Sequence, residues 1–267
     1  MTIGVIISTY NNPKWLEKTL WSYQAQSRKA DEIIIADDGS RDDTRQLIEQ
    51  MKAFLPIQHV WHEDKGFRKT KILNDALKIA TADYLIFTDQ DCVARPDFIA
   101  THEQYAQKGY ILSGGYFKLP MDISEMLTRD DIMSGRAFQL RWLLRQGMKR
   151  TFKCTKLIGK PWFSVLMNHI TPTHATWNGM NSSGWRKDIL EVNGFDERMQ
   201  YGGEDREMGE RLFNKGIRSK QIRYSAIVLH LDHGRPYVNQ EAWDRNNAIR
   251  RETKQKKLTW TPFGIDK

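Results

Sequence analysis

The sequence contains very little cysteine: Cys92 and Cys154 are the only two among its 267 residues. Two thiols cannot form the disulfide framework of a small secreted domain or a cysteine-based zinc cluster. This scarcity favours a protein of a reducing compartment. A chain of this length can bury a substantial hydrophobic core, so we expect a folded globular protein.

Long hydrophobic runs are also missing. The first apolar run covers only residues 3–7 and leads directly into a patterned fold, which does not resemble a signal peptide. No apolar stretch approaches the roughly 20 residues that a membrane-spanning helix needs. We therefore expect a cytoplasmic protein.

Two glycine-rich phosphate-binding motifs are absent as well. The basic run at residues 65–71 contains one glycine but does not match G-x-x-x-x-G-K-[ST], which argues against a P-loop ATPase. No G-x-G-x-x-G follows the first apolar run, which argues against a dinucleotide-dependent oxidoreductase.

Positive charge, by contrast, is abundant. The net charge of +8 predicts an anionic partner, such as a phosphorylated small molecule, a nucleic acid or an acidic membrane surface. Basic residues gather at positions 141–160 and 245–257. The simpler explanation is a solvated surface. The alternative that we carry forward is peripheral contact with an anionic inner membrane face, where a lipid-linked acceptor would lie.

The first half of the chain alternates short apolar runs with helical patterns. We predict strands at residues 3–8, 32–36, 57–61 and 84–88, and helices at 15–26, 41–54 and 69–80. Such alternation is typical of an α/β fold with a mainly parallel sheet flanked by helices. The later pattern predicts a helix at 205–215, a strand at 222–231 and a basic C-terminal helix at 240–257.

We predict one domain over residues 1–267, with four parts. Residues 1–117 form the nucleotide-binding half, 118–176 a helical or irregular insertion or lid, 177–235 the acceptor-binding and catalytic half, and 236–267 a basic tail.

Polar residues follow each predicted strand of the first half, where ligands bind in parallel α/β sheets. They are residues 9–13, 37–40, 63–66 and 89–91. Helix caps explain part of this pattern. Caps do not require several acidic clusters at one sheet edge, because clustered carboxylates repel one another without a cation. Asp89 and Asp91 are oxygen ligands of the kind that Mg²⁺ or Mn²⁺ binds, although a solvated turn is the alternative.

Further candidates come from the second half. His230 and His233 follow an apolar run, and imidazole beside carboxylates favours Mn²⁺ over Mg²⁺. Glu204 and Asp205 open a helix after Gly202 and Gly203. A carboxylate there could act as a general base, and the glycines would let a substrate approach closely. Ordinary helix capping is an equally good explanation of these two acids.

Several motifs together resemble the inverting family 2 glycosyltransferases. Three of them, VIISTYN at 5–11, IADDGS at 35–40 and TDQD at 88–91, resemble that family's nucleotide-binding half. Gly66-Phe67-Arg68 with Asn74 is similar to chondroitin-polymerase-like members. The later motifs NGMNSS at 178–183, NGFD at 193–196 and GGED at 202–205 resemble a galactosyltransferase-type segment. The resemblance implies a GT-A (Rossmann-like) fold.

The resemblance also implies roles for individual residues. Donor-binding roles fall on Ser8, Tyr10, Asp38, Arg68, Asn74 and Asp89, with Tyr10 stacking on uracil and Asp38 hydrogen-bonding it. Metal-binding roles fall on Asp91 and on His230 or His233. Sugar- or acceptor-binding roles fall on Trp177, Asn181, Trp185 and Gly203. Asp205 would be the catalytic base, and Glu204 would hold sugar hydroxyls.

The predicted function is therefore metal-dependent, inverting transfer of a sugar from a UDP-sugar to a glycan acceptor, in bacterial surface polysaccharide or lipopolysaccharide synthesis. The predicted cofactor is Mn²⁺ or Mg²⁺. Two alternatives stay open, a sugar nucleotidyltransferase and a non-catalytic polysaccharide-binding protein. The acidic clusters argue against a nucleic-acid partner.

Overall fold

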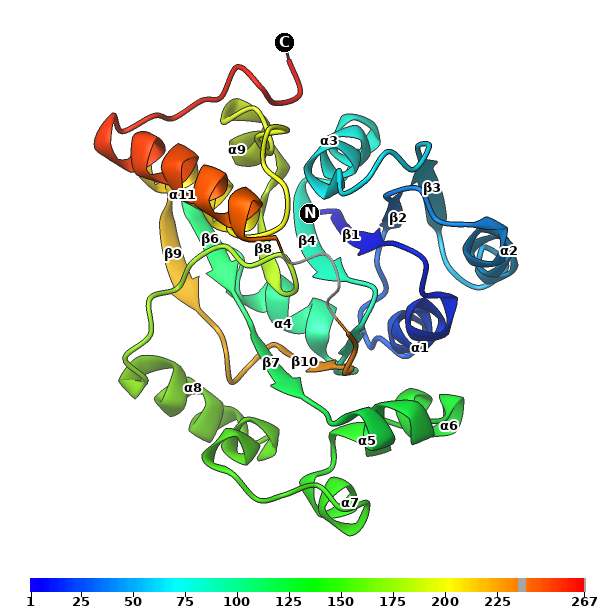
Figure 1. Ribbon diagram of the computed structural model, residues 1–267. Helices are drawn as coiled ribbons and strands as arrows, with labels where there is room; N and C mark the ends of the chain where they lie inside the picture. The colour runs from blue at the N-terminus through cyan, green and yellow to red at the C-terminus, as the bar shows by residue number, and fades with distance from the viewer. Residues whose placement is uncertain (235–238, 267) are drawn as a thin grey trace.

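The computed structural model describes residues 1–234 and 239–266. Within these residues the strands form a seven-stranded sheet, in the order β3-β2-β1-β4-β8-β6-β9, and a three-stranded sheet, in the order β5-β10-β7 (Figure 1). The strands are β1 (Ile3–Thr9), β2 (Glu32–Asp37), β3 (Ile57–Trp61), β4 (Tyr84–Asp89), β5 (Cys92–Ala94), β6 (Tyr110–Ser113), β7 (Gly115–Lys118), β8 (Ser182–Trp185), β9 (Arg218–Gln221) and β10 (Ile227–His230).

Helices cover both faces of the large sheet and the outer side of the small one. The helices are α1 (Pro13–Gln24), α2 (Asp42–Met51), α3 (Lys69–Ile79), α4 (Phe98–Tyr105), α5 (Met121–Met126), α6 (Arg129–Met133), α7 (Leu140–Arg145), α8 (Pro161–Ile170), α9 (Arg186–Glu191), α10 (Glu204–Asn214) and α11 (Gln240–Gln255), with short 3₁₀ turns at Arg136–Phe138 and Phe152–Leu157. None of the helices in the described part of the chain has the length and apolar character of a membrane span.

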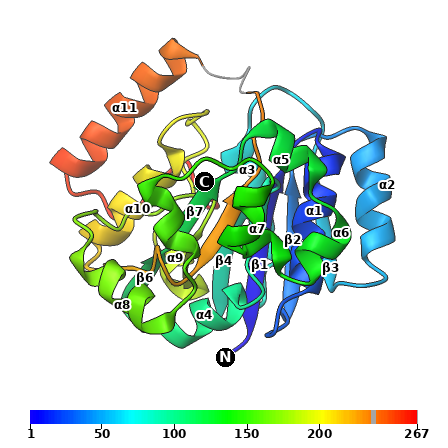
Figure 2. The same cartoon turned by 90° about the horizontal axis from the view of Figure 1, so that it is seen from below.

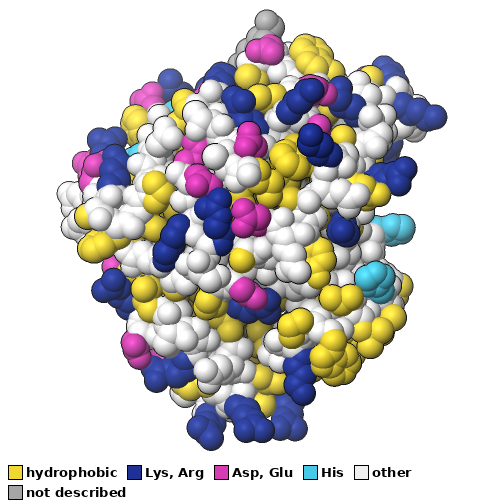
Figure 3. All heavy atoms as spheres, turned by 180° about the vertical axis from the view of Figure 1, so that it is seen from behind, with side chains coloured by type: hydrophobic (Ala, Val, Ile, Leu, Met, Phe, Trp, Pro, Cys, Tyr) yellow, Lys and Arg dark blue, Asp and Glu magenta, His cyan; other side chains and the backbone are white. Residues whose placement is uncertain are grey.

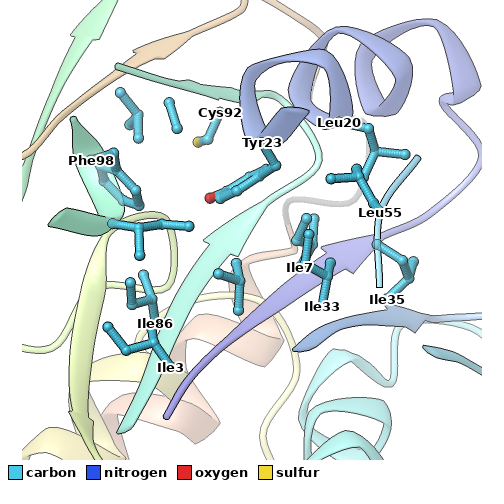
Figure 4. Packing of buried hydrophobic residues seen from close by; sticks show 14 of the residues in the cluster. Ile3, Ile7, Leu20, Tyr23, Ile33, Ile35, Leu55, Ile86, Cys92 and Phe98 are labelled. Carbon is cyan, nitrogen blue, oxygen red and sulfur yellow. The ribbon is translucent and has the colours of Figure 1, made fainter. Parts of the chain in front are cut away.

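The predicted mainly parallel α/β fold is confirmed. Strands β1 to β4 pair in parallel, with β1 between β2 and β4. In β1, β2 and β4 the side chains alternate between two buried faces, so apolar residues occupy most positions, whereas β3 at the sheet edge is partly exposed. Ile7 and Ile35 lie in the core on the side of α1, where Leu55 is beside Ile35 (Figure 4), whereas Ile6 and Ile34 pack on the side of α3 and α10. Burial on both faces is therefore the reason for the continuous apolar runs.

The second half of the chain adds β8 and β9 to the large sheet and β10 to the small one. We predicted a single strand over residues 222–231, but the chain forms β9 in the large sheet and β10 in the small one. Between them the backbone turns, with the Ala226 N–H donating to the Ile222 carbonyl. Within the predicted range only Ile227–His230 forms a strand, because β9 ends at Gln221 and residues 222–226 form the turn.

The predicted insertion at 118–176 is largely helical. Helices α5 to α8 lie together at the lower end of the molecule in Figure 1 and toward the viewer in Figure 2. The side chains of Phe117, Leu119 and Leu143 join those of β10 in a third hydrophobic core. This packing makes α5 to α7 part of the folded body that supports the small sheet.

Candidate active site

A cavity of about 760 Å³ lies at the carboxyl ends of β1, β2 and β4 and at the start of α10. This volume is typical of a small-molecule site. The predicted site residues that line it are Ser8, Tyr10, Asp38, Asp89, Asp91, Trp177, Gly203, Glu204, Asp205, His230 and His233. The fold thus brings together three groups of residues that are far apart in the sequence.

Three predicted donor or sugar residues do not line this cavity: Asn74, Asn181 and Trp185. Asn74 is fully buried on α3, where its amide donates to the Phe195 carbonyl and accepts from the Phe195 N–H. Asn181 is also fully buried and donates to the Gly115 carbonyl. Trp185 donates its indole N–H to the Gln107 carbonyl. Each of these side chains satisfies backbone groups outside the cavity, which is a structural role.

Arg68 contributes to the site through its backbone N–H. Its N–H donates to Asp38 Oδ2 over 2.9 Å, while its side chain turns to the Glu63 carbonyl. The other oxygen of Asp38 contacts His62 Nε2 at 2.7 Å. Asp38 is therefore held in one orientation from both sides, and burial raises the pKa of its carboxyl group. Sequence reasoning missed His62, because nothing in the sequence connects it with Asp38.

The entrance to this part of the cavity is formed by the segment after β1. The Tyr10 ring is 46% exposed, and its hydroxyl donates to Asp64 Oδ2 over 2.8 Å. The Gln90 side chain accepts from the Tyr10 N–H and donates to the Tyr10 carbonyl, both over 3.1 Å. Gln90 therefore fixes the backbone of Tyr10 and leaves its ring free to face a ligand. The sequence motif contained Gln90, but its role was not predicted.

Asp91, His230 and His233 form a compact cluster. His233 Nε2 lies 2.7 Å and His230 Nε2 lies 3.5 Å from Asp91 Oδ2, and the two imidazole rings are stacked. One ligand atom from each of the three residues lies within 4.8 Å of the others. Burial would raise the pKa of Asp91, but the hydrogen bond from His233 and the nearby imidazoles outweigh burial and lower it.

This cluster fits a divalent cation of the Mn²⁺ type. One carboxylate oxygen and two imidazole nitrogens are a suitable donor set, and they converge from the segments after β4 and β10. His230 Nδ1 is buried and has no hydrogen-bond partner within residues 1–234 and 239–266. The structure brings both histidines to Asp91, so it does not separate the two candidate ligands.

A second acidic group stands at the start of α10. Gly202 and Gly203 adopt positive φ angles of 114° and 89°, which are open mainly to glycine, and this sharp entry turns both acids toward the cavity. Glu204 Oε2 accepts from the Gly202 N–H, and Asp205 Oδ2 accepts from the Gly179 N–H over 3.0 Å. Asp205 Oδ1 is buried and, among the described residues, has no hydrogen-bond partner.

Lys69 connects the two acidic groups. Its ammonium donates to Asp89 Oδ1 over 2.8 Å, and the Ser8 hydroxyl donates to the same oxygen over 2.6 Å. Burial opposes the charge on Lys69, but the carboxylates of Asp89, Asp205 and Glu204 raise its pKa well above the usual value. Sequence reasoning placed Lys69 only within a basic run. That run was the available signal, but it did not show which cation points inward.

The two acids of α10 have unusual proton affinities. Burial, together with the charge of Asp205, raises the pKa of Glu204 to about 7. Burial also raises the pKa of Asp205, although the positive charge of Lys69 opposes this effect. A carboxyl group with a raised pKa in a cavity is suited to exchange protons with a substrate.

The raised pKa of Glu204 predicts a pH-dependent stability. The unfolded chain loses this proton near the usual 4.5, but the folded chain keeps it until about 7, so rising pH favours unfolding across this window. The shift corresponds to about 3 kcal/mol at full ionisation. We expect Glu204→Gln to raise the free energy of unfolding at pH 8 more than at pH 5, measured by urea unfolding without ligand. An equal effect at both pH values would contradict the raised pKa.

Comparison with protein families identifies two matching segments. Residues 4–161 match the model of glycosyl transferase family 2. Residues 167–234 match the family model for the N-terminal domain of galactosyltransferase. The two matches meet at the cavity, because the first contains Asp38 and Asp91 and the second contains Asp205 and His230.

Two enzymes that are similar in sequence to this chain are a glucosyltransferase and a chondroitin synthase. The chain is 29% identical to validoxylamine A glucosyltransferase of Streptomyces hygroscopicus subsp. jinggangensis over 227 residues, which cover 80% of this chain and 52% of the relative. It is 26% identical to chondroitin synthase of Escherichia coli over 251 residues, covering 85% and 34%. The chain thus spans about half, or less, of the length of these relatives.

Solved structures share the fold. The mannosyltransferase PcManGT of Pyrobaculum calidifontis, in complex with GDP-Man and Mn²⁺, superposes with a TM-score of 0.58 at 18% identity, covering 95% of this chain and 61% of that one. Residues 1–349 of TarS from S. aureus, in complex with UDP, give a TM-score of 0.62 at 16% identity, covering 96% and 68%. These matches confirm the expected GT-A fold. From its family match, its fold and the transferases that it resembles, this chain is a member of the enzyme family glycosyl transferase family 2.

Proposed function

We propose that this protein is a metal-dependent, inverting glycosyltransferase that moves a sugar from a UDP-sugar to a hydroxyl group of a glycan acceptor. The observation that carries the proposal is that Asp91 with its two histidines and Asp205 with Glu204 line one cavity. The similarity to chondroitin synthase supports a polysaccharide acceptor, and we propose that this polysaccharide belongs to a bacterial surface.

The nucleotide end of the donor would lie between Tyr10 and Asp38. The exposed ring of Tyr10 offers a stacking face, and Asp38 offers a carboxylate that is already oriented by His62 and Arg68. Lys69 and Ser8 hold Asp89 beside this position. Because Lys69 carries a positive charge in the cavity, it would also attract the diphosphate.

The diphosphate requires compensation of its charge when it leaves. A divalent cation held by Asp91, His230 and His233 would supply this compensation as a Lewis acid. The protein's own contribution is to keep the Asp91 carboxylate ionised and buried among the imidazoles, where electrostatic attraction is stronger than in water.

The acceptor would be activated by Asp205. Its Oδ1 atom takes the proton of the acceptor hydroxyl while that oxygen attacks the anomeric carbon, and the bond from this carbon to the diphosphate breaks. Attack from the face opposite the leaving group inverts the anomeric configuration. The Gly179 N–H holds the other oxygen of the carboxylate over 3.0 Å and so fixes the base. Glu204, beside it, would hold sugar hydroxyls.

Donor screening tests this function. Purified protein with Mn²⁺ is given a series of UDP-sugars and GDP-sugars, with and without oligosaccharide acceptors, and the released nucleotide is measured. We expect acceptor-stimulated release of UDP and a product of inverted configuration by NMR. Release of pyrophosphate would identify a nucleotidyltransferase instead, and absence of Mn²⁺-dependent UDP binding in calorimetry would favour a polysaccharide-binding protein.

Gly179→Ala tests whether the base needs its exact position. A Cβ atom at Gly179 would lie 2.6 Å from Asp205 Oδ2, closer than van der Waals contact permits. The carboxylate must therefore move, and a displacement of about 1 Å can lower the rate by roughly 10²-fold. We expect kcat to fall to that extent while UDP affinity, measured by calorimetry, stays within a small factor of the parent's. Normal kcat in a folded variant would show that Asp205 tolerates displacement.

A further inference from the structure

Helix α8 has one face that attaches it to the protein and one that does not. On the attached face Ser164 and Met167 are buried, and Asn168 accepts from the Tyr224 N–H and donates to the Ser225 hydroxyl. These contacts fix the orientation of the helix. The opposite face is therefore presented to solvent as a defined surface.

That opposite face is apolar. Trp162, Val165, Leu166 and Ile170 follow helical spacing and are 65%, 42%, 47% and 60% exposed. Two further apolar residues precede the helix, Phe152 at 72% and Ile158 at 41% exposure. We call these six residues the α8 surface. The four large apolar side chains on one face of α8 indicate an interaction site, since isolated exposed residues would be scattered.

The chain around the α8 surface is basic and contains no acid. The sequence has no Asp or Glu between Asp131 and Asp188. The exposed basic residues of this stretch that precede α8 and do not pair with Asp130 or Asp131 are Arg141, Arg145, Lys149, Arg150, Lys153 and Lys160. Figure 3 shows hydrophobic side chains gathered at the lower right and basic ones along the lower edge, in the region of α7 and α8. The partner of this surface must therefore combine apolar and anionic character.

We infer that the α8 surface docks on an anionic lipid bilayer, with Trp162 and Ile170 entering the interface and the basic residues contacting lipid phosphates. An amphipathic helix with tryptophan on one side and cations around it is suited to this position. Lysine and arginine can extend to the headgroups while apolar side chains insert. Residues 132–187 contain no acid that would repel the lipid phosphates.

The basic C-terminal helix is a less suitable candidate for the same role. Helix α11 packs on α10 through Ala242, Asn246 and Ile249, and its outer side carries Glu241, Asp244 and Glu252 among the cations. The exposed large apolar residues of the described chain include none from α11. Of the two basic segments seen in the sequence, the one before α8 therefore carries the proposed contact.

The docking surface is separate from the catalytic cavity. None of the described residues from 132 to 170 lines that cavity. The inference therefore does not rest on the proposed sugar transfer, and variants of the α8 surface should leave UDP affinity and turnover on a soluble acceptor unchanged.

Vesicle co-sedimentation of the full chain tests the inference. Vesicles of phosphatidylcholine are compared with vesicles that also contain phosphatidylglycerol, at low salt. We expect binding only to the anionic vesicles. Trp162→Gln with Ile170→Gln should weaken binding by about 10-fold or more, because buried apolar area is lost. Arg145→Gln with Lys153→Gln should weaken it by roughly 30-fold, because each cation near the surface contributes about fivefold.

The matched control is Arg245→Gln with Arg251→Gln, which removes the same charge from exposed positions of α11. We expect this control to bind within a small factor of the parent. Equal loss in the control would show a general charge effect and would overturn the inference. Failure of the parent to bind anionic vesicles would overturn it too. Size-exclusion chromatography adds a third outcome. If the parent is a dimer and the Trp162 and Ile170 variant is a monomer, the surface binds a second copy of the chain and the inference is overturned.

Discussion

Asp205→Asn should lower kcat by roughly 10²- to 10⁴-fold, the usual contribution of proton transfer by a positioned base. The asparagine keeps the shape of the side chain, and its amide oxygen can still accept from the Gly179 N–H, as Asp205 Oδ2 does. It cannot take a proton from the acceptor. Loss of one negative charge beside Glu204 should leave UDP-sugar affinity equal or slightly higher, because repulsion of the donor diphosphate decreases.

The pH dependence provides a second readout of the same substitution. Burial raises the pKa of both acids of α10, and that of Glu204 lies at about 7. The base must be ionised to act, so kcat/KM of the parent should rise with pH through a range above that of an ordinary aspartate and then level, because burial raises the pKa of Asp205. In Asp205→Asn the rise should disappear, because the proton-accepting group is gone.

A suitable control is Asp42→Asn. Asp42 also lies in the first turn of a helix, but it is exposed on α2 and outside the cavity. We expect it to retain normal turnover and the normal pH profile. If Asp205→Asn retains most of its activity with complete inversion of configuration, another group is the base and the assignment is wrong.

Removal of the metal is expected to have the other large effect on turnover. Chelation by EDTA should lower turnover by about 10³-fold, because charge compensation by a bound cation contributes several kcal/mol to the transition state. Mn²⁺ should restore the parent fully. Asp91→Asn should abolish most Mn²⁺ binding in calorimetry, since the carboxylate faces both histidines at 2.7 and 3.5 Å. Activity that survives EDTA treatment would contradict the metal-dependent mechanism.

The same calorimetry decides between the two histidines. His230→Gln and His233→Gln are measured separately for Mn²⁺ affinity, with the exposed His174→Gln as the control. Replacing a histidine that ligates the metal should lower the Mn²⁺ affinity at least about tenfold. Even residues that only support a metal ligand contribute 10- to 100-fold to metal affinity. A histidine whose replacement leaves the affinity unchanged is not a ligand.

Much of the fold could be predicted from the first half of the sequence. The four parallel strands lie within one or two residues of their predicted positions, because strands buried on both faces need continuous apolar runs with polar residues at their ends. The prediction was weaker where local pattern and tertiary pairing differ. Residues 222–231 read as one strand, but the structure divides them between a turn and β10, after the separate strand β9.

The candidate site, like the fold, could be predicted from the sequence only in part. Polar residues after the strands lead to Asp38, Asp89 and Asp91, because ligands bind at that edge of an α/β sheet. Asn74 and Asn181 belong to motifs of the same resemblance, yet their amides bond buried backbone groups. A sequence does not distinguish a polar side chain that meets a ligand from one that satisfies the backbone.

The sequence by itself determined the chemistry that is available: carboxylates and imidazoles at strand ends, a glycine-entered acidic helix, and a basic stretch without acids before α8. Only the tertiary structure decided which of these groups share an environment. It placed Lys69 between Asp89 and the α10 acids and turned one apolar face of α8 to solvent. The physical reason is that charge interactions and burial depend on distance in space, which chain folding sets and residue spacing does not.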